Sequence, residues 1–179
     1  MKLLWMILFG ILAAGCSTKH YYMLSSPHAI ETEKTIKTTI GVESVALPDY
    51  LQAGKIAVLH DDQSITFLDG AFWAVDMQKD LTNGLIFDLQ KSFPQSRIYH
   101  YPWEGTGQPA HLLSLKIKRF IAHGKEVYLD AVVRLDNRDR VISIREPIQK
   151  SDAAGIVAGM KRAFFRLEHA VADLLDDMI

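Results

Sequence analysis

The sequence predicts a single α+β domain in which a mainly antiparallel sheet carries two amphipathic helices on one face. Three observations lead to this class. Segments in which apolar and polar residues alternate, as in strands with one wetted face, follow one another in the second half of the chain. Two longer segments repeat apolar residues every three or four positions, which is typical of helices. The length of 179 residues suits one domain with a sizeable core.

The strands of the first half are short and are separated by turn-forming residues. Residues 21–24 predict a strand, and the polar stretch 25–37 predicts a loop. Residues 39–47 predict a second strand that Pro48 ends, because proline has no N–H to donate to a sheet. Residues 98–101 predict another short strand.

A hairpin and the first helix are predicted between these strands. Residues 56–59 and 65–68 flank a polar turn, which indicates the hairpin. A helix is predicted to open after Asp69 and Gly70 and to end at Pro94. Its apolar residues recur every four positions, at Trp73, Met77, Leu81, Leu85, Leu89 and Phe93.

A three-stranded meander is predicted in the second half. Residues 113–118, 127–136 and 141–144 form its strands, with turns at 123–124 and 137–139. The residues between the first and second strands include His-Gly, which favours a turn.

The last helix is predicted to begin at Ser151, with Asp152 in the first turn favouring the helix dipole. A seam of seven apolar residues could be a coiled-coil face, but it covers fewer than three heptads, so packing on the sheet is favoured. The seam consists of Val157, Met160, Phe164, Leu167, Val171, Leu174 and Met178.

The first sixteen residues predict a lipoprotein signal peptide. Lys2 precedes an apolar run of about twelve residues, which is too short to span a bilayer but suits a signal peptide. Leu12-Ala-Ala-Gly-Cys16 has the form of a lipobox, although an ordinary secretory signal with a chance cysteine is the alternative. The predicted organisation is a cleaved signal (1–15), a lipidated tether (16–20) and one domain (21–179).

Cys16 would then carry a covalent diacylglycerol and an N-acyl chain, a palmitate for example. Several acyl chains make a stable anchor. Ser17 follows the cysteine where Asp would retain an enteric lipoprotein at the inner membrane, so the expected location is the outer membrane, facing the periplasm. Four residues separate Cys16 from Tyr21 and reach at most about 14 Å, which places the domain close to the membrane.

Composition and motifs exclude several functions. The formal net charge is −1, and it becomes 19 − 21 = −2 without Lys2, so no basic surface for nucleic acid is expected. A single cysteine rules out an intramolecular disulfide and thiolate metal sites. The histidines form no metal-binding motif, and the sequence contains no nucleophile elbow and no phosphate-binding glycine loop. We therefore expect no catalytic residues, no metal and no enzyme activity.

Partner binding is the remaining class of function, and two segments are candidates for it. The stretch 45–51 contributes Pro48, Tyr50 and Leu51, which could dock a partner or simply end a strand. Tyr101 and Trp103 flank Pro102 in a predicted loop, where exposed aromatic residues are favoured interface anchors, although they could equally belong to the core.

Four features together resemble a known family. They are the lipobox closely followed by Tyr-Tyr-Met-Leu (21–24), the segment Ile-Gly-Val-Glu-Ser-Val-Ala-Leu-Pro-Asp-Tyr-Leu (40–51), the dipeptide Trp73-Ala74, and Phe120 before a glycine turn and a long alternating strand. The chain resembles the PqiC-like (YmbA-like) auxiliary lipoproteins of MCE-type and ABC-type transporters, typified by the paraquat-inducible Pqi system. The resemblance extends over essentially the whole mature chain and adds Trp73 to the candidate partner-binding residues.

The resemblance implies a non-enzymatic role in lipid movement and envelope integrity. The lipoprotein would dock an MCE-domain protein (PqiB-like) at the outer membrane. Through this protein it would be linked to an inner-membrane component (PqiA-like). A homo-oligomeric ring of the lipoprotein would suit docking onto a multimeric tube. The alternative is a periplasmic carrier that binds lipid in an apolar pocket of its own.

Overall fold

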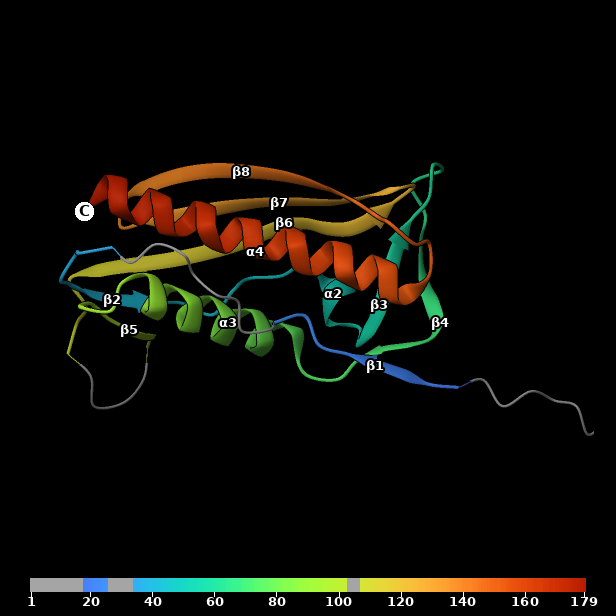
Figure 1. The fold of residues 1–179 in the computed structure, drawn as a ribbon, viewed down its shortest axis with the longest axis horizontal. Coiled ribbons are helices and arrows are strands. Elements are labelled where there is room, and N and C mark those ends of the chain that lie inside the picture. Colours follow the sequence, from blue (N-terminus) through green and yellow to red (C-terminus); the bar gives the residue numbers. More distant parts are fainter. Residues whose placement is uncertain (1–17, 26–33, 103–106) are drawn as a thin grey trace, which may run out of the picture.

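The computed structural model describes residues 18–25, 34–102 and 107–179. Over these residues the chain forms eight strands and three helices, which Figure 1 labels. Their order is β1 (His20–Tyr22), β2 (Thr39–Val42), α2 (Asp49–Gln52), β3 (Lys55–Leu59), β4 (Ile65–Trp73), α3 (Met77–Ser92), β5 (Arg97–His100), β6 (His111–His123), β7 (Glu126–Leu135), β8 (Arg138–Pro147) and α4 (Ala153–Met178).

All eight strands belong to one mixed sheet around the long strand β6. On one side of β6 lie β7 and then β8, both antiparallel to their neighbours. On the other side, β2 pairs in parallel with the first residues of β6, and β3 pairs in parallel with its last residues. Strand β5 extends the sheet beyond β2, whereas β4 and β1 extend it beyond β3. The α+β class is therefore confirmed.

The predicted meander is present and its strands are longer than expected. Strands β7 and β8 pair without interruption from Glu126 with Pro147 to Leu135 with Arg138. Gly124 has a φ of +59° in the turn between β6 and β7, a conformation that glycine adopts without steric cost. Strand β6 contains one irregularity between Ile117 and Arg119.

The first long helix starts later than predicted. Asp69 and Gly70, which were expected to open it, lie inside β4, and Trp73 is the last residue of that strand. The prediction was wrong because the backbone here is paired with β1 and β3, two contacts that the sequence pattern does not reveal. The helix α3 begins after Asp76, whose side chain accepts a hydrogen bond from the Lys79 N–H at 2.9 Å.

The last helix is capped by the residue after the predicted one. Asp152, not Ser151, is the N-cap of α4, and its carboxylate accepts a hydrogen bond from the Gly155 N–H at 2.7 Å. The apolar seam of α4 packs on the sheet within the monomer, as favoured above. Gly159 permits this close approach, because a Cβ there would lie 3.0 Å from a methyl group of Val127 on β7.

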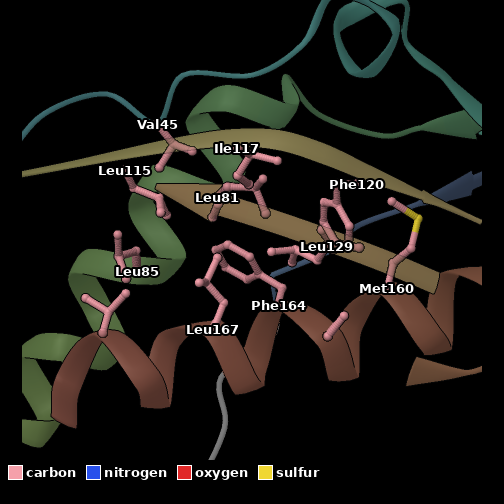
Figure 2. Packing of buried hydrophobic residues seen from close by; sticks show 14 of the residues in the cluster. Val45, Leu81, Leu85, Leu115, Ile117, Phe120, Leu129, Met160, Phe164 and Leu167 are labelled. Carbon is pink, nitrogen blue, oxygen red and sulfur yellow. The ribbon is translucent and has the colours of Figure 1, made fainter. Parts of the chain in front are cut away.

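The core lies between the sheet and the two long helices, which lie in front of it in Figure 1. Figure 2 shows Phe120 and Leu129 of the sheet facing Met160 and Phe164 of α4. Leu85 of α3 joins the same cluster. The short helix α2 and the early end of β2 at Val42 were not predicted.

Candidate partner-binding site

The segment that follows β2 fills a gap in the sheet. Strand β6 is paired by β2 at its start and by β3 at its end, and the connection from Glu43 to Tyr50 runs along the interval between them. The Glu43 and Ala46 N–H groups donate to carbonyls of β6, each at 2.9 Å, and the Ile117 N–H donates back to the Ala46 carbonyl at 2.9 Å. Buried backbone groups of β6 thereby find partners without a continuous neighbouring strand.

Tyr50 and Leu51 complete this connection. The Phe120 N–H donates a hydrogen bond to the Tyr50 hydroxyl oxygen at 2.8 Å, and burial raises the pKa of that hydroxyl above its usual value. Leu51 belongs to the core, and Pro48 is the N-cap of α2. These contacts give the motif a structural role, while its contact with a partner stays a prediction.

Trp73 and Leu51 meet at a small cavity. The cavity measures about 50 Å³ and its lining also includes Gly54, Val75 and Met77. The Trp73 backbone N–H donates to the Gly54 carbonyl at 3.0 Å, which fixes the end of β4 beside α2. Within the described residues, the buried Trp73 Nε1–H has no hydrogen-bond partner. A cavity of this size is too small for a drug-sized ligand.

Tyr101 lies apart from that cavity. It is half-buried just after β5, and its N–H donates to the Val42 carbonyl at 2.8 Å. The peptide bond between Tyr101 and Pro102 is cis. Trp103, the other aromatic residue predicted in this loop, and the lipobox residue Cys16 lie outside the described residues. The structure therefore places Pro48, Tyr50, Leu51 and Trp73 in one neighbourhood and Tyr101 in another.

A depression at the start of β2 and β5 escaped the sequence analysis. It measures about 400 Å³, and no apolar stripe marks it in the sequence. Its lining residues come from the segment before β2, from the start of β5 and from the residue before β6, namely Lys37, Thr38, Thr39, Gln95, Arg97 and Ala110.

A cluster of buried carboxyl groups between α3 and α4 was also missed. The Asp80 carboxylate accepts hydrogen bonds from the N–H groups of Leu24 and Ser25, both at 3.0 Å, and from the Ser25 hydroxyl. Glu168 is buried in α4, and desolvation together with the neighbouring Asp88 raises its pKa to about 9. Glu168 falls within the apolar face of α4, a placement that could have flagged it.

This cluster ties helices together rather than forming a metal site. Among the residues that the structure describes, no group of three or more His, Cys, Asp or Glu side chains is placed to hold a metal ion. Glu168 shares a side-chain hydrogen bond with Asp88, and the cavity beside them measures about 10 Å³. None of the helices in the described part of the chain has the length and apolar composition of a membrane span.

These features define a single α+β domain whose predicted functional residues are aromatic and apolar. Residues 22–172 match the family of ABC-type transport auxiliary lipoprotein components, and the chain belongs to this family. The resemblance inferred from the motifs is thus confirmed. The family is one of transport components and not of enzymes.

Solved structures share the fold. A protein described as uncharacterized has 18% sequence identity and a TM-score of 0.70, over 88% of this chain and 99% of the other. Protein XCC0632 from Xanthomonas campestris, of the DUF330 family, has 13% identity and a TM-score of 0.65, over 87% and 90%. No curated protein matches the chain.

Proposed function

We propose that the protein is an outer-membrane lipoprotein that docks the MCE-domain protein of a Pqi-like lipid transport system. Membership of the auxiliary lipoprotein family is the observation that carries this proposal. The lipobox at Cys16 supports the anchor, and Ser17 supports the outer membrane over the inner one. The domain begins within a few residues of the anchor, so it stays beside the membrane and meets a partner that crosses the periplasm.

The packing favours docking over the alternative of a lipid carrier. A phospholipid carrier requires a large apolar pocket. Among the described residues, the space between sheet and helices is filled by side chains, and the cavities at Trp73 and Glu168 measure about 50 and 10 Å³. The larger depression is open to solvent, whereas acyl chains require an enclosed pocket.

Affinity purification from intact envelopes tests the docking function. A tag after Ile179, an exposed residue at the end of α4, should recover an MCE-domain protein together with the lipoprotein. Recovery of no such partner, with the lipoprotein fully functional in its absence, would refute the proposal. Phospholipid that co-purifies with the domain in stoichiometric amount would favour the carrier instead.

The anchor has its own test. Cys16→Ala removes the acylated thiol, so we expect loss of acylation and at least a tenfold fall in the membrane-bound fraction, measured by fractionation and immunoblot. The variant Ser17→Ala keeps the cysteine and serves as the matched control. Unchanged membrane attachment of Cys16→Ala would contradict the lipobox interpretation.

A further inference from the structure

An exposed aromatic surface lies where the described chain begins. We call it the N-terminal aromatic face and define it as Lys19, Tyr21, Lys55, Phe67 and Phe72. Tyr21 is 62% exposed and Phe67 is 39% exposed, so both rings meet solvent in the folded protein. A group of exposed apolar side chains, unlike a single one, can mark a contact surface.

Strand pairing places these residues on one side of the sheet. Tyr21 of β1 pairs with Phe72 of β4, and Phe72 pairs in turn with Lys55 of β3. Phe67 pairs with Ala57, two residues from Lys55 on β3, and the register shifts between these two pairs. Phe67 is exposed and lies outside the core cluster, which places it on the side away from the core. The residues that alternate with them belong to the core on the other side, namely Ile56, Ala71 and Trp73.

The side chains of the face contact one another. The rings of Tyr21 and Phe72 are stacked with their centroids 5.6 Å apart. The ammonium groups of Lys19 and Lys55 lie 5.9 and 5.7 Å from the centroid of the Phe72 ring. The result is a stacked pair of aromatic rings with two cations over Phe72, a combination that suits the boundary between acyl chains and headgroups.

We propose that the N-terminal aromatic face lies on the phospholipid surface that holds the protein's anchor. This proposal rests on the proposed lipidation of Cys16. The described chain begins at Thr18, two residues after Cys16. Tyr21 comes five residues after Cys16, so it lies within about 18 Å of the anchor. A surface tethered at this distance meets the bilayer continually, and no other exposed aromatic residue is so close along the described chain.

Charge complementarity supports the same occupant. Lysine side chains near an anionic bilayer surface are attracted to its headgroups. Tyrosine and phenylalanine gain by placing their rings at headgroup depth, whereas on a free surface they remain in water. The acyl chains attach the protein to the membrane, and the N-terminal aromatic face orients it. In this orientation β1 and β4 face the bilayer, and β2 and β5 lie at the end that points away from the bilayer.

The experiment uses the lipidated full-length mature protein in vesicles of phosphatidylethanolamine and phosphatidylglycerol. Because Cys16 is the only cysteine and its thiol is acylated, a new cysteine can be labelled alone. Phe67→Cys and Gln95→Cys carry the same environment-sensitive fluorophore, and the vesicles contain a spin-labelled lipid as quencher. Gln95 is an exposed residue two positions before β5, and Figure 1 shows β5 and β1 at opposite ends of the longest axis.

We expect at least threefold stronger quenching at residue 67 than at residue 95. The double variant Lys19→Glu and Lys55→Glu should reduce quenching at residue 67 at least twofold, with an unchanged melting temperature. Equal quenching at both positions of an acylated protein would overturn the orientation and leave the anchor intact. Absence of the acyl mass on Cys16, measured by mass spectrometry, would instead refute the anchor itself.

Discussion

The two ends of the molecule present different surfaces. At one end, β1 and β4 display the N-terminal aromatic face, in which two lysines border stacked rings. At the other end, β2 and β5 border a polar depression of about 400 Å³ that contains Lys37 and Arg97. Figure 1 shows the two groups of strands separated along the longest axis. Both ends carry basic side chains, and the first adds a stacked pair of aromatic rings beneath two of them.

An anchored docking protein makes two contacts, one with the membrane and one with its protein partner, and the two ends suit different ones. An apolar surface with cations suits a bilayer, whereas a polar surface stays in water until a protein partner covers it. Tyr101 lies at the polar end, and Trp73 lies where β4 ends near α2. The connection from Glu43 to Tyr50 joins the strands of both ends to β6. The following predictions test whether the ends differ as described.

The largest expected effect separates a phenylalanine of the core from one on the aromatic face. Phe120→Ala should lower the free energy of unfolding by about 3–5 kcal/mol, because Phe120 is 0% exposed and its removal leaves a cavity. Phe67→Ala, the matched control on the aromatic face, should cost less than about 1 kcal/mol. Urea unfolding measures both. A comparable loss for Phe67→Ala would make that residue part of the core and not of a membrane surface.

A smaller and pH-dependent effect is expected at Glu168, which joins α4 to α3. Its pKa of about 9 in the folded protein exceeds the ordinary value of 4.5, so between these values the folded state holds a proton that the unfolded state releases. Stability should therefore fall as pH rises through this range. Glu168→Gln should stabilise the protein by about 1–3 kcal/mol at pH 8 and by less at pH 5.

Thermal unfolding at a series of pH values measures this effect. Gln retains the shape of the side chain and can donate to Asp88, so the variant should lose the pH dependence without losing the packing. A difference between wild type and variant that is the same at pH 5 and pH 8 would show that Glu168 is not protonated in the folded state.

The hydrogen bond at Tyr50 tests the connection between the two ends. Tyr50→Phe removes the acceptor of the Phe120 N–H, which should cost about 1–2 kcal/mol in urea unfolding. Tyr99→Phe changes another tyrosine, whose hydroxyl donates to the Gly107 carbonyl at 3.3 Å, and should cost less. An equal or smaller cost for Tyr50→Phe would mean that its hydroxyl contributes nothing to holding β6.

The smallest effect is expected at the polar end, where Lys34 bridges two carboxylates. Its ammonium group lies 2.9 Å from both Asp173 and Asp176. Burial lowers its pKa, but the hydrogen bonds to these carboxylates outweigh burial and hold the pKa above its usual value. Lys34→Met should cost less than about 1 kcal/mol and lose its effect at high salt. A loss that salt leaves unchanged would assign the stabilisation to packing.

The sequence predicted the parts of the fold whose contacts are local. The meander followed from alternation and turn residues, because antiparallel neighbours are adjacent in the chain. The parallel pairs of β1 with β4 and of β2 with β6 join distant segments, and no local pattern reveals them. For this reason Trp73, a strand residue, was assigned to a helix.

The candidate site was predicted in the same uneven way. The motif that contains Tyr50 and Leu51 was identified from the sequence. Its hydrogen bonds to β6 were not, because they fill the interval between β2 and β3 along β6, which exists only in the folded sheet. The negative charge of Asp176, near the C-terminus of α4, opposes the helix dipole. Its ion pair with Lys34, more than a hundred residues earlier, is a contact that no local pattern in the sequence reveals.

Photo-crosslinking in intact envelopes tests the central claim most directly. A photoreactive phenylalanine analogue replaces Tyr101 at the polar end or Phe67 on the aromatic face, in otherwise identical proteins. The account predicts that irradiation joins an MCE-domain protein to residue 101, whereas residue 67 captures lipid and no such protein. Capture of the MCE-domain protein through residue 67, with none through residue 101, would contradict the assignment of membrane and partner to opposite ends.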